Sequence, residues 1–147
     1  MKKQVYQFCE QYIFDRFERI KNNIQEVQNS LSSETKSSAG DKHETGRAML
    51  QLEREKLGQQ LLEAEKTLEL LQKVSVTKTS SSASLGSLVS TTNGTYYIAI
   101  SAGKFENMGD VIYCISANTP IGKLLMGQSQ GDTFVFNGNE HKILEIN

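Results

Sequence analysis

The residues of this sequence whose types and spacing best suit a chemical role are two carboxylates three positions apart. Asp41 and Glu44 stand in the stretch SSAGDKHETG, after a serine-rich segment and before a long segment with helical periodicity. When only one or two protein carboxylates bind Mg²⁺, water and phosphate oxygens supply the remaining ligands. An Asp followed three residues later by a Glu at a helix start also matches a capping box. Because each carboxylate has about four acceptor sites and a cap uses only one or two of them, the two roles are compatible.

Other chemical motifs are missing from the sequence or weak. It has no phosphate-binding loop, no dinucleotide-binding glycine motif, no nucleophile elbow and no His and Cys cluster with metal-ligand spacing. Cys114 lies in an apolar stretch that predicts a buried and inert thiol, and only His43 and His141 are possible base partners for it. Five aromatic residues could form a stacking platform for single-stranded nucleic acid, but lysine is scarce around them, so we expect core packing: Tyr96, Tyr97, Tyr113, Phe134 and Phe136.

Length and charge exclude several classes of protein. The 147 residues leave room for one ordinary domain or two small ones, and the net charge of -1 calls for no nucleic acid, membrane or strongly charged ligand. The opening stretch MKKQVYQFCEQYIFDRF carries charges throughout, so we expect no signal peptide. No run approaches the roughly 18 apolar residues of a membrane span. Because Cys9 and Cys114 also lack metal-type spacing, we expect a reduced, cytoplasmic protein with no membrane partner.

The N-terminal half has the periodicity of a coiled coil. Its residues 1–78 hold 13 of the 16 Lys and Arg and 12 of the 17 Asp and Glu. Apolar residues recur at steps of three and four in two runs, and the second predicts a helix from about residue 44 to 74. Because neither run can bury its stripe alone, we expect an antiparallel helical hairpin over residues 1–75, with an intermolecular coiled coil as the alternative. The two runs are Ile13, Phe17, Ile20, Ile24, Val27 and Leu31, and Leu50, Leu57, Leu61, Ala64, Leu68 and Leu71, with Arg54 interrupting the second.

The connection between the two helices, about residues 32–43, is polar and longer than most helix-to-helix connections. It places the acidic tip, near residues 41–44, at the exposed end of the hairpin. Long exposed loops often carry function.

The C-terminal part predicts a small antiparallel β domain with one short helix, over residues 85–147, after a Ser/Thr-rich linker over residues 76–84. Asn93-Gly94 and Asn137-Gly138 each stand between two strand-like runs, and Asn-Gly supplies the positive φ angles of tight hairpins. The run DVIYCIS is apolar throughout, which is typical of an interior strand. The fold class is therefore α+β.

The short helix has start and stop signals in the stretch NTPIGKLLMG. Thr119 can cap it, Pro120 suits the first helical position, and Gly127 can close it.

Two stretches resemble the bacterial Gre transcript-cleavage factors, GreA and GreB, of which this chain would be a short variant. GDKHETG resembles the tip motif of that family, G-D-x-x-E-N, and places Asp41 and Glu44 on its two acidic positions. The stretch from Ile115 to Ile146 resembles the C-terminal signature I-S-x-x-S-P-I-G-x-A-L-L-G-x-x-x-G-D-x-V. Seven residues fall in register with that signature: Pro120, Ile121, Gly122, Leu125, Gly127, Gly131 and Asp132.

The resemblance implies a fold and a function. Gre factors combine a coiled-coil hairpin with a C-terminal domain of FKBP-like fold, bind RNA polymerase and pass the hairpin through its secondary channel. Asp41 and Glu44 would then help to hold an Mg²⁺ shared with the polymerase and orient a water that hydrolyses the 3′ end of backtracked RNA. Thr119, Pro120 and Ile121 match the loop that contacts the polymerase.

On this resemblance the chain is a transcription elongation factor and is not itself an enzyme, because it stimulates the endonuclease activity of the polymerase. It has no cofactor of its own, is a monomer, and meets nascent RNA and DNA only within the elongation complex.

Two alternatives stay open. After Glu44 the Gre pattern continues with Asn, an acid and Tyr, whereas this chain has TGRAML, which favours a secondary-channel protein that regulates the polymerase without promoting cleavage. The third possibility is a structural coiled-coil dimer in which the two acids are helix caps. A peptidyl-prolyl isomerase role has little support, because an FKBP-like fold does not carry the activity.

Overall fold

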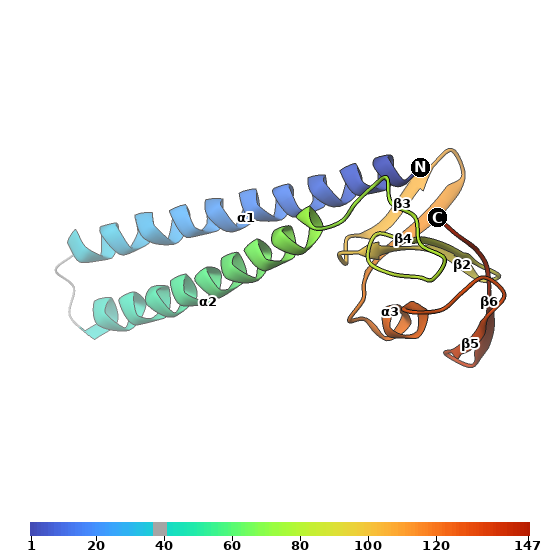
Figure 1. Cartoon of the computed structure of the whole chain (residues 1–147). Helices are drawn as coiled ribbons and strands as arrows, with labels where there is room; N and C mark the ends of the chain where they lie inside the picture. The colour runs from blue at the N-terminus through green and yellow to red at the C-terminus, as the bar shows by residue number, and fades with distance from the viewer. Residues whose placement is uncertain (37–40) are drawn as a thin grey trace. The chain divides into compact units, whose positions relative to one another are not determined.

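The computed structural model describes residues 1–36 and 41–147, and the side chains of residues 34–43 lie outside its described part. Two long helices come first, and strands with one short helix follow (Figure 1). This order confirms the predicted α+β class, a helical hairpin ahead of a β-sheet with a short helix. The elements are α1 (Lys2–Lys36), α2 (Asp41–Gln72), β1 (Leu88–Thr91), β2 (Gly94–Ala99), β3 (Gly103–Asn107), β4 (Asp110–Ser116), α3 (Pro120–Leu125), β5 (Thr133–Phe136) and β6 (Asn139–Ile146).

The chain divides into two compact units. Ile13–Thr67 form one of them, here called the hairpin unit, and Met1–Tyr12 with Leu68–Asn147 form the other, the sheet unit. The division into a hairpin over 1–75, a linker over 76–84 and a domain over 85–147 stays a prediction. Within the predicted linker, Ala83 is buried. Its N–H donates to the Gln128 carbonyl at 2.7 Å, and its carbonyl accepts from the Gly127 N–H at 2.8 Å.

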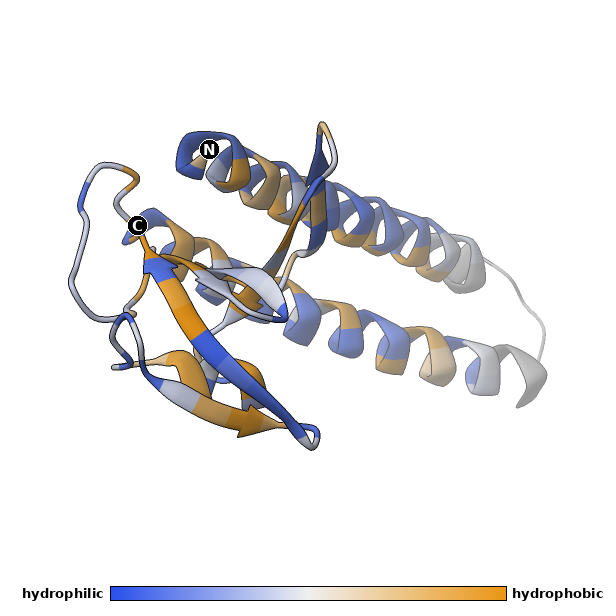
Figure 2. Ribbon diagram, turned by 90° about the vertical axis from the view of Figure 1, so that its right-hand side faces the viewer, coloured by the Kyte–Doolittle hydropathy of each residue, from blue (hydrophilic) through white to orange (hydrophobic). Residues whose placement is uncertain are grey.

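In the hairpin unit the two helices bury the predicted stripe against each other. They run side by side in opposite directions (Figure 1), with apolar segments recurring along both (Figure 2). Within this unit, five members of the stripe are buried: Ile13, Ile20 and Val27 from α1, and Leu57 and Ala64 from α2. Other members are half-buried: Phe17, Ile24, Leu31, Leu50 and Leu61. Pairing within one chain therefore accounts for the seam, and Arg16 with Glu63 adds an ion pair of 3.8 Å across it.

The sheet has the strand order β3-β4-β2-β1-β6-β5. Among the described residues, adjacent strands are antiparallel as predicted, except that β2 and β4 run parallel. The reason is β3, which was not predicted: the chain leaves β2, forms β3 and turns back, so that β4 lies between them. As predicted, β4 is an interior strand.

Of the two predicted hairpin turns, one has the expected positive φ angles and the other does not. Between β5 and β6, Asn137 and Gly138 have φ angles of 52° and 78°, as an Asn-Gly hairpin requires. The hairpin at Asn93-Gly94 also forms, but Gly94 already belongs to β2, and the described residues of that turn lack positive φ angles. There the Thr91 hydroxyl closes the turn, donating to the Gly94 carbonyl at 2.8 Å and accepting from the Asn93 N–H at 3.2 Å.

Both faces of the central strands are buried inside the sheet unit. On one face Val89 and Ile98 belong to a core cluster that also contains Ala83, Ile121, Leu125, Phe134 and Ile143. Leu88, Tyr97 and Cys114 are cross-strand neighbours on β1, β2 and β4, and alternation along the strands puts them on the opposite face. These three are also buried, at 8%, 0% and 3% exposed, so the sheet has packed neighbours on both sides.

Candidate functional site

The predicted acidic pair falls in the first turn of α2. The helix begins at Asp41, and Glu44 follows three residues later with an exposed side chain. The side chains of Asp41, Lys42 and His43, and with them the predicted capping contacts, lie outside the described residues. Because residues three apart in a helix share a face, positions 41 and 44 lie on one side of this turn.

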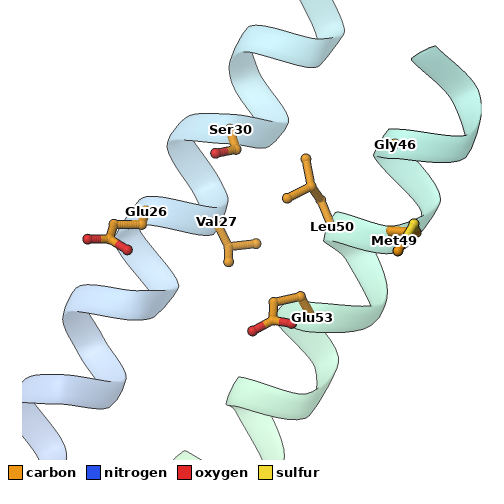
Figure 3. Close-up of a pocket in the computed structure, with 7 residues that line it drawn as sticks. All are labelled: Glu26, Val27, Ser30, Gly46, Met49, Leu50 and Glu53. Atoms are coloured by element: carbon orange, nitrogen blue, oxygen red, sulfur yellow. The ribbon is translucent and has the colours of Figure 1, made fainter. Parts of the chain in front are cut away.

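A hollow separates the helices just beyond this turn. It has a volume of about 680 Å³ and an apolar centre where Val27 and Leu50 point into the space between the helices (Figure 3). Its other lining residues are Glu26, Ser30, Gly46, Met49 and Glu53. Gly46 and Ser30 leave room because they are small.

The described part of the site does not form a metal centre. Mg²⁺ prefers about six oxygen ligands in octahedral geometry, and a carboxylate supplies one or two. Within the described residues, no group of three or more His, Cys, Asp or Glu side chains gathers to hold a metal ion. The exposed carboxylate of Glu44 has the right chemistry for one position of such a site.

The second predicted site, Thr119 to Ile121, lies at the start of α3. Thr119 is the N-cap, where its hydroxyl accepts from the Gly122 N–H at 3.1 Å and donates to the Ser116 carbonyl at 2.7 Å. Pro120 is exposed at the first helical position, as predicted. Ile121 is only 7% exposed and packs in the core cluster. Of these three side chains, Pro120 is therefore the one most available to a partner.

The other signature residues serve the fold in the same way. Gly122 is buried, and a Cβ there would overlap the Ser116 carbonyl oxygen and lie 2.8 Å from the Thr119 hydroxyl. Leu125 belongs to the core cluster, and Gly127 ends the helix with a φ of 82°. The Asp132 carboxylate accepts from the Ser129 N–H at 2.7 Å. The packing and the turn contacts at α3 thus explain most of the C-terminal signature.

The aromatic residues behave as predicted only in part. Tyr97 and Phe134 are buried, and Phe134 stacks on the buried His141 with ring centroids 4.9 Å apart. Tyr113 is 42% exposed, and its ring lies 5.9 Å from that of the half-buried Tyr96. Cys114 is buried, as the sequence predicted.

Among the described residues, none of the helices combines the length and the apolar character needed to cross a membrane.

Comparisons with known proteins find a likeness among the solved structures. No family model matches the chain, and no curated protein matches it. Among solved structures, the chain is similar to one described as the structure of the transcription factor Gfh1, with 20% sequence identity and a TM-score of 0.36. The similarity covers 91% of this chain and 90% of that chain.

Proposed function

We propose that this chain is a transcription elongation factor that binds bacterial RNA polymerase, inserts its helical hairpin into the secondary channel and stimulates cleavage of backtracked RNA. One observation carries the proposal: the exposed Glu44, with Asp41 one turn before it, stands at the start of the second helix of a hairpin, where the Gre tip motif has its acids. The resemblance in the C-terminal stretch, whose residues form the α3 turn, supports it independently.

The metal belongs to the complex and not to this chain alone. The carboxylates of Asp41 and Glu44 would bind Mg²⁺ shared with the polymerase, which supplies charge stabilisation and an activated water for phosphodiester hydrolysis. The chain's own part is to bring two acids to that centre on a hairpin whose seam is packed. It acts as a monomer in the cytoplasm and meets RNA and DNA only within the elongation complex.

The α3 turn would make a smaller contribution. Because Thr119 and Ile121 are committed to the cap and the core, contact with the polymerase would use Pro120 and the backbone around it. Replacing Pro120 would then weaken binding without unfolding the sheet unit.

The test uses a backtracked elongation complex assembled with the core polymerase of the source bacterium. We expect the wild-type chain to raise the rate of RNA cleavage, and Asp41→Ala and Glu44→Ala each to lower the stimulated rate at least tenfold. Glu65→Ala is the matched control, because Glu65 is an exposed acid of α2 outside the first turn. Cleavage that is not stimulated by the wild type, in a complex that the chain does bind, would overturn the cleavage role.

A specific observation favours a second function, a secondary-channel regulator that does not promote cleavage. Position 46, where the Gre pattern has a further acid, is Gly46, and it lines the hollow between the helices. Under this function the wild type and the acid variants would bind the polymerase and compete with other channel proteins equally well, and none of them would stimulate cleavage. Competition and cleavage measured on the same samples separate the two functions.

A further inference from the structure

Two cysteines far apart in the sequence meet inside the sheet unit. Cys9 lies on α1 and Cys114 on β4, and their side chains are 0% and 3% exposed. Both are free thiols, and each is the neighbour that most perturbs the pKa of the other. Burial of a single thiol needs no explanation, but two thiols in contact are one oxidation step away from a covalent bond.

Neighbouring contacts hold the two thiols together. Beside Cys9 on α1, the Phe8 ring meets Phe105 of β3 edge to face, with centroids 5.4 Å apart. Phe105 and Cys114 lie on paired strands, where Cys114 stands opposite Gly103. On the helix side, the Tyr6 hydroxyl donates to the Leu71 carbonyl of α2 at 3.3 Å. The first turns of α1 are therefore anchored both to the sheet and to the end of α2.

The surroundings of the pair are polar as well as buried. Tyr97, the cross-strand neighbour of Cys114 on β2, is fully buried, and among the described residues its hydroxyl has no hydrogen-bond partner. Burial, with the nearby Cys9, Tyr6 and Cys114, raises the pKa of this hydroxyl above its usual range.

We propose that Cys9 and Cys114 are a redox-responsive pair, which a small peroxide converts into a reversible intramolecular disulfide that ties the start of α1 to β4. The pair makes no use of the acidic tip, so this inference does not depend on the proposed role in transcription.

The chemistry balances with hydrogen peroxide as the only oxidant. The thiolate of one cysteine attacks one peroxide oxygen, the O–O bond breaks, and a sulfenic acid forms on that cysteine with release of one water. The sulfur of the other cysteine then attacks the sulfenic sulfur, the S–O bond breaks, and the disulfide forms with release of a second water. Two thiols lose two electrons, and one peroxide is reduced to two waters. A thiol reductant reverses the reaction by exchange.

The two thiols act on each other. Cys114, with burial, raises the pKa of Cys9, and Cys9 lowers the pKa of Cys114. Because the thiolate is the nucleophile, the sulfur that loses its proton reacts first, and the thiol beside it resolves the sulfenic acid. A peroxide is small enough to reach the pair through local opening of the first turns of α1.

The bond would change stability because it closes a long loop. The loop spans residues 10–113 and includes the whole hairpin unit, and in the chain-entropy account stabilisation grows with loop length. We therefore expect oxidation to raise the Tm of the sheet unit by roughly 10 °C.

The experiment uses the full chain, purified under reducing conditions and then treated with hydrogen peroxide. Peptide mapping without reduction should recover the Cys9 and Cys114 peptides as one cross-linked species in monomeric protein, which dithiothreitol separates. The Tm should rise on oxidation and return on reduction. Cys9→Ala and Cys114→Ala should show no rise in Tm and no cross-linked species.

Two results would overturn the proposal. One is a folded wild type whose cysteines are oxidised separately, with no link between the two peptides. The other is a link that forms only between chains, seen as a covalent dimer. Should an alanine variant fail to fold, the peptide map and the Tm shift of the wild type still decide, since neither needs a variant.

Discussion

The sheet unit and the hairpin unit bury their apolar residues in different ways. In the sheet unit the central strands are covered on both faces, so that Tyr97 and its sequence neighbour Ile98 are both fully buried although they point in opposite directions. In the hairpin unit a single seam is buried, and residues beside it stay half-exposed. A residue of the sheet unit is thus enclosed by several elements, whereas a residue of the hairpin meets one neighbouring helix and water.

This difference in burial explains which side chains of each unit are exposed to a binding partner. The two-sided core fixes the α3 turn and leaves few side chains of the C-terminal signature exposed. The hairpin buries only its seam, and Glu44, in the first turn of α2, is exposed beside it. Identical substitutions in the two units should therefore have different effects. Three comparisons test this, and a fourth experiment tests the hairpin alone.

Truncation of a buried isoleucine should give the largest effect and the clearest contrast. Ile98→Ala removes a fully buried side chain from the core cluster and should cost about 4 kcal/mol of unfolding free energy, since the two-sided core cannot collapse onto the cavity. Ile20→Ala, in the hairpin seam, should cost about 2 kcal/mol, because neighbouring side chains and water can fill the space.

Urea unfolding with two probes measures both substitutions. All five tyrosines lie within Met1–Tyr12 and Leu68–Asn147, so tyrosine fluorescence reports on the sheet unit alone, while ellipticity at 222 nm is dominated by the two long helices. Equal losses for the two variants would contradict the contrast.

Replacing a glycine by alanine should have opposite signs in the two units. Gly122→Ala places a Cβ against the Ser116 carbonyl and should destabilise the sheet unit by about 2 kcal/mol through overpacking. Gly58→Ala, inside α2, meets only the end of the flexible Arg54 side chain, 3.3 Å away. It should stabilise the hairpin by about 0.5 kcal/mol, because alanine favours a helix. A stabilising Gly122→Ala would show that the α3 turn is less tightly packed than described.

Removal of a threonine hydroxyl should also change stability differently in the two units. Thr119→Ala removes the cap of α3 and should lower the free energy of unfolding by about 1 kcal/mol. Thr119→Ser keeps the hydroxyl and should retain most of that stability. In the hairpin, the Thr67 hydroxyl only bonds the Glu63 carbonyl one turn back, a contact that competes with regular helix geometry. Thr67→Ala should therefore be neutral or slightly stabilising by the same thermal and urea measurements.

The smallest effect is expected at the ion pair across the hairpin. Arg16 and Glu63 are 3.8 Å apart, and the Glu63 side chain is 69% exposed. A double-mutant cycle with Arg16→Gln and Glu63→Gln should give a coupling below about 0.5 kcal/mol that fades as salt is added. A larger coupling that persists in salt would mean that the hairpin depends on more than its seam.

Sequence reasoning recovered the elements whose signals are local. The seam from Ile13 to Leu71, the Asn137-Gly138 turn and the cap at Thr119 each depend on residues a few positions apart, and the structure confirms all three. Val5 and Cys9, which are also buried, continue the stripe at four-residue steps toward the start of α1, within the predicted span of 1–75. The strand β3 was missed because GKFEN is short and charged, although the Gly109 turn after it was a usable signal.

Contacts between distant segments could not be predicted in the same way. The parallel pairing of β2 with β4, the anchoring of Ala83 beside Gly127 and the meeting of Cys9 with Cys114 all join segments whose approach is set by the whole fold. For the candidate site, the type and spacing of Asp41 and Glu44 were evident from the sequence, whereas the hollow behind Gly46 required the structure.

The Mg²⁺ dependence of stimulated RNA cleavage tests the central claim most directly. Cleavage in a backtracked elongation complex would be measured over a range of Mg²⁺ concentrations with the wild type, Glu44→Gln and the control Glu65→Gln. If Glu44 is a ligand of the shared ion, Glu44→Gln should lower the maximal stimulated rate and raise the Mg²⁺ concentration at half-saturation, while Glu65→Gln follows the wild type. Identical curves for wild type and Glu44→Gln would contradict the account.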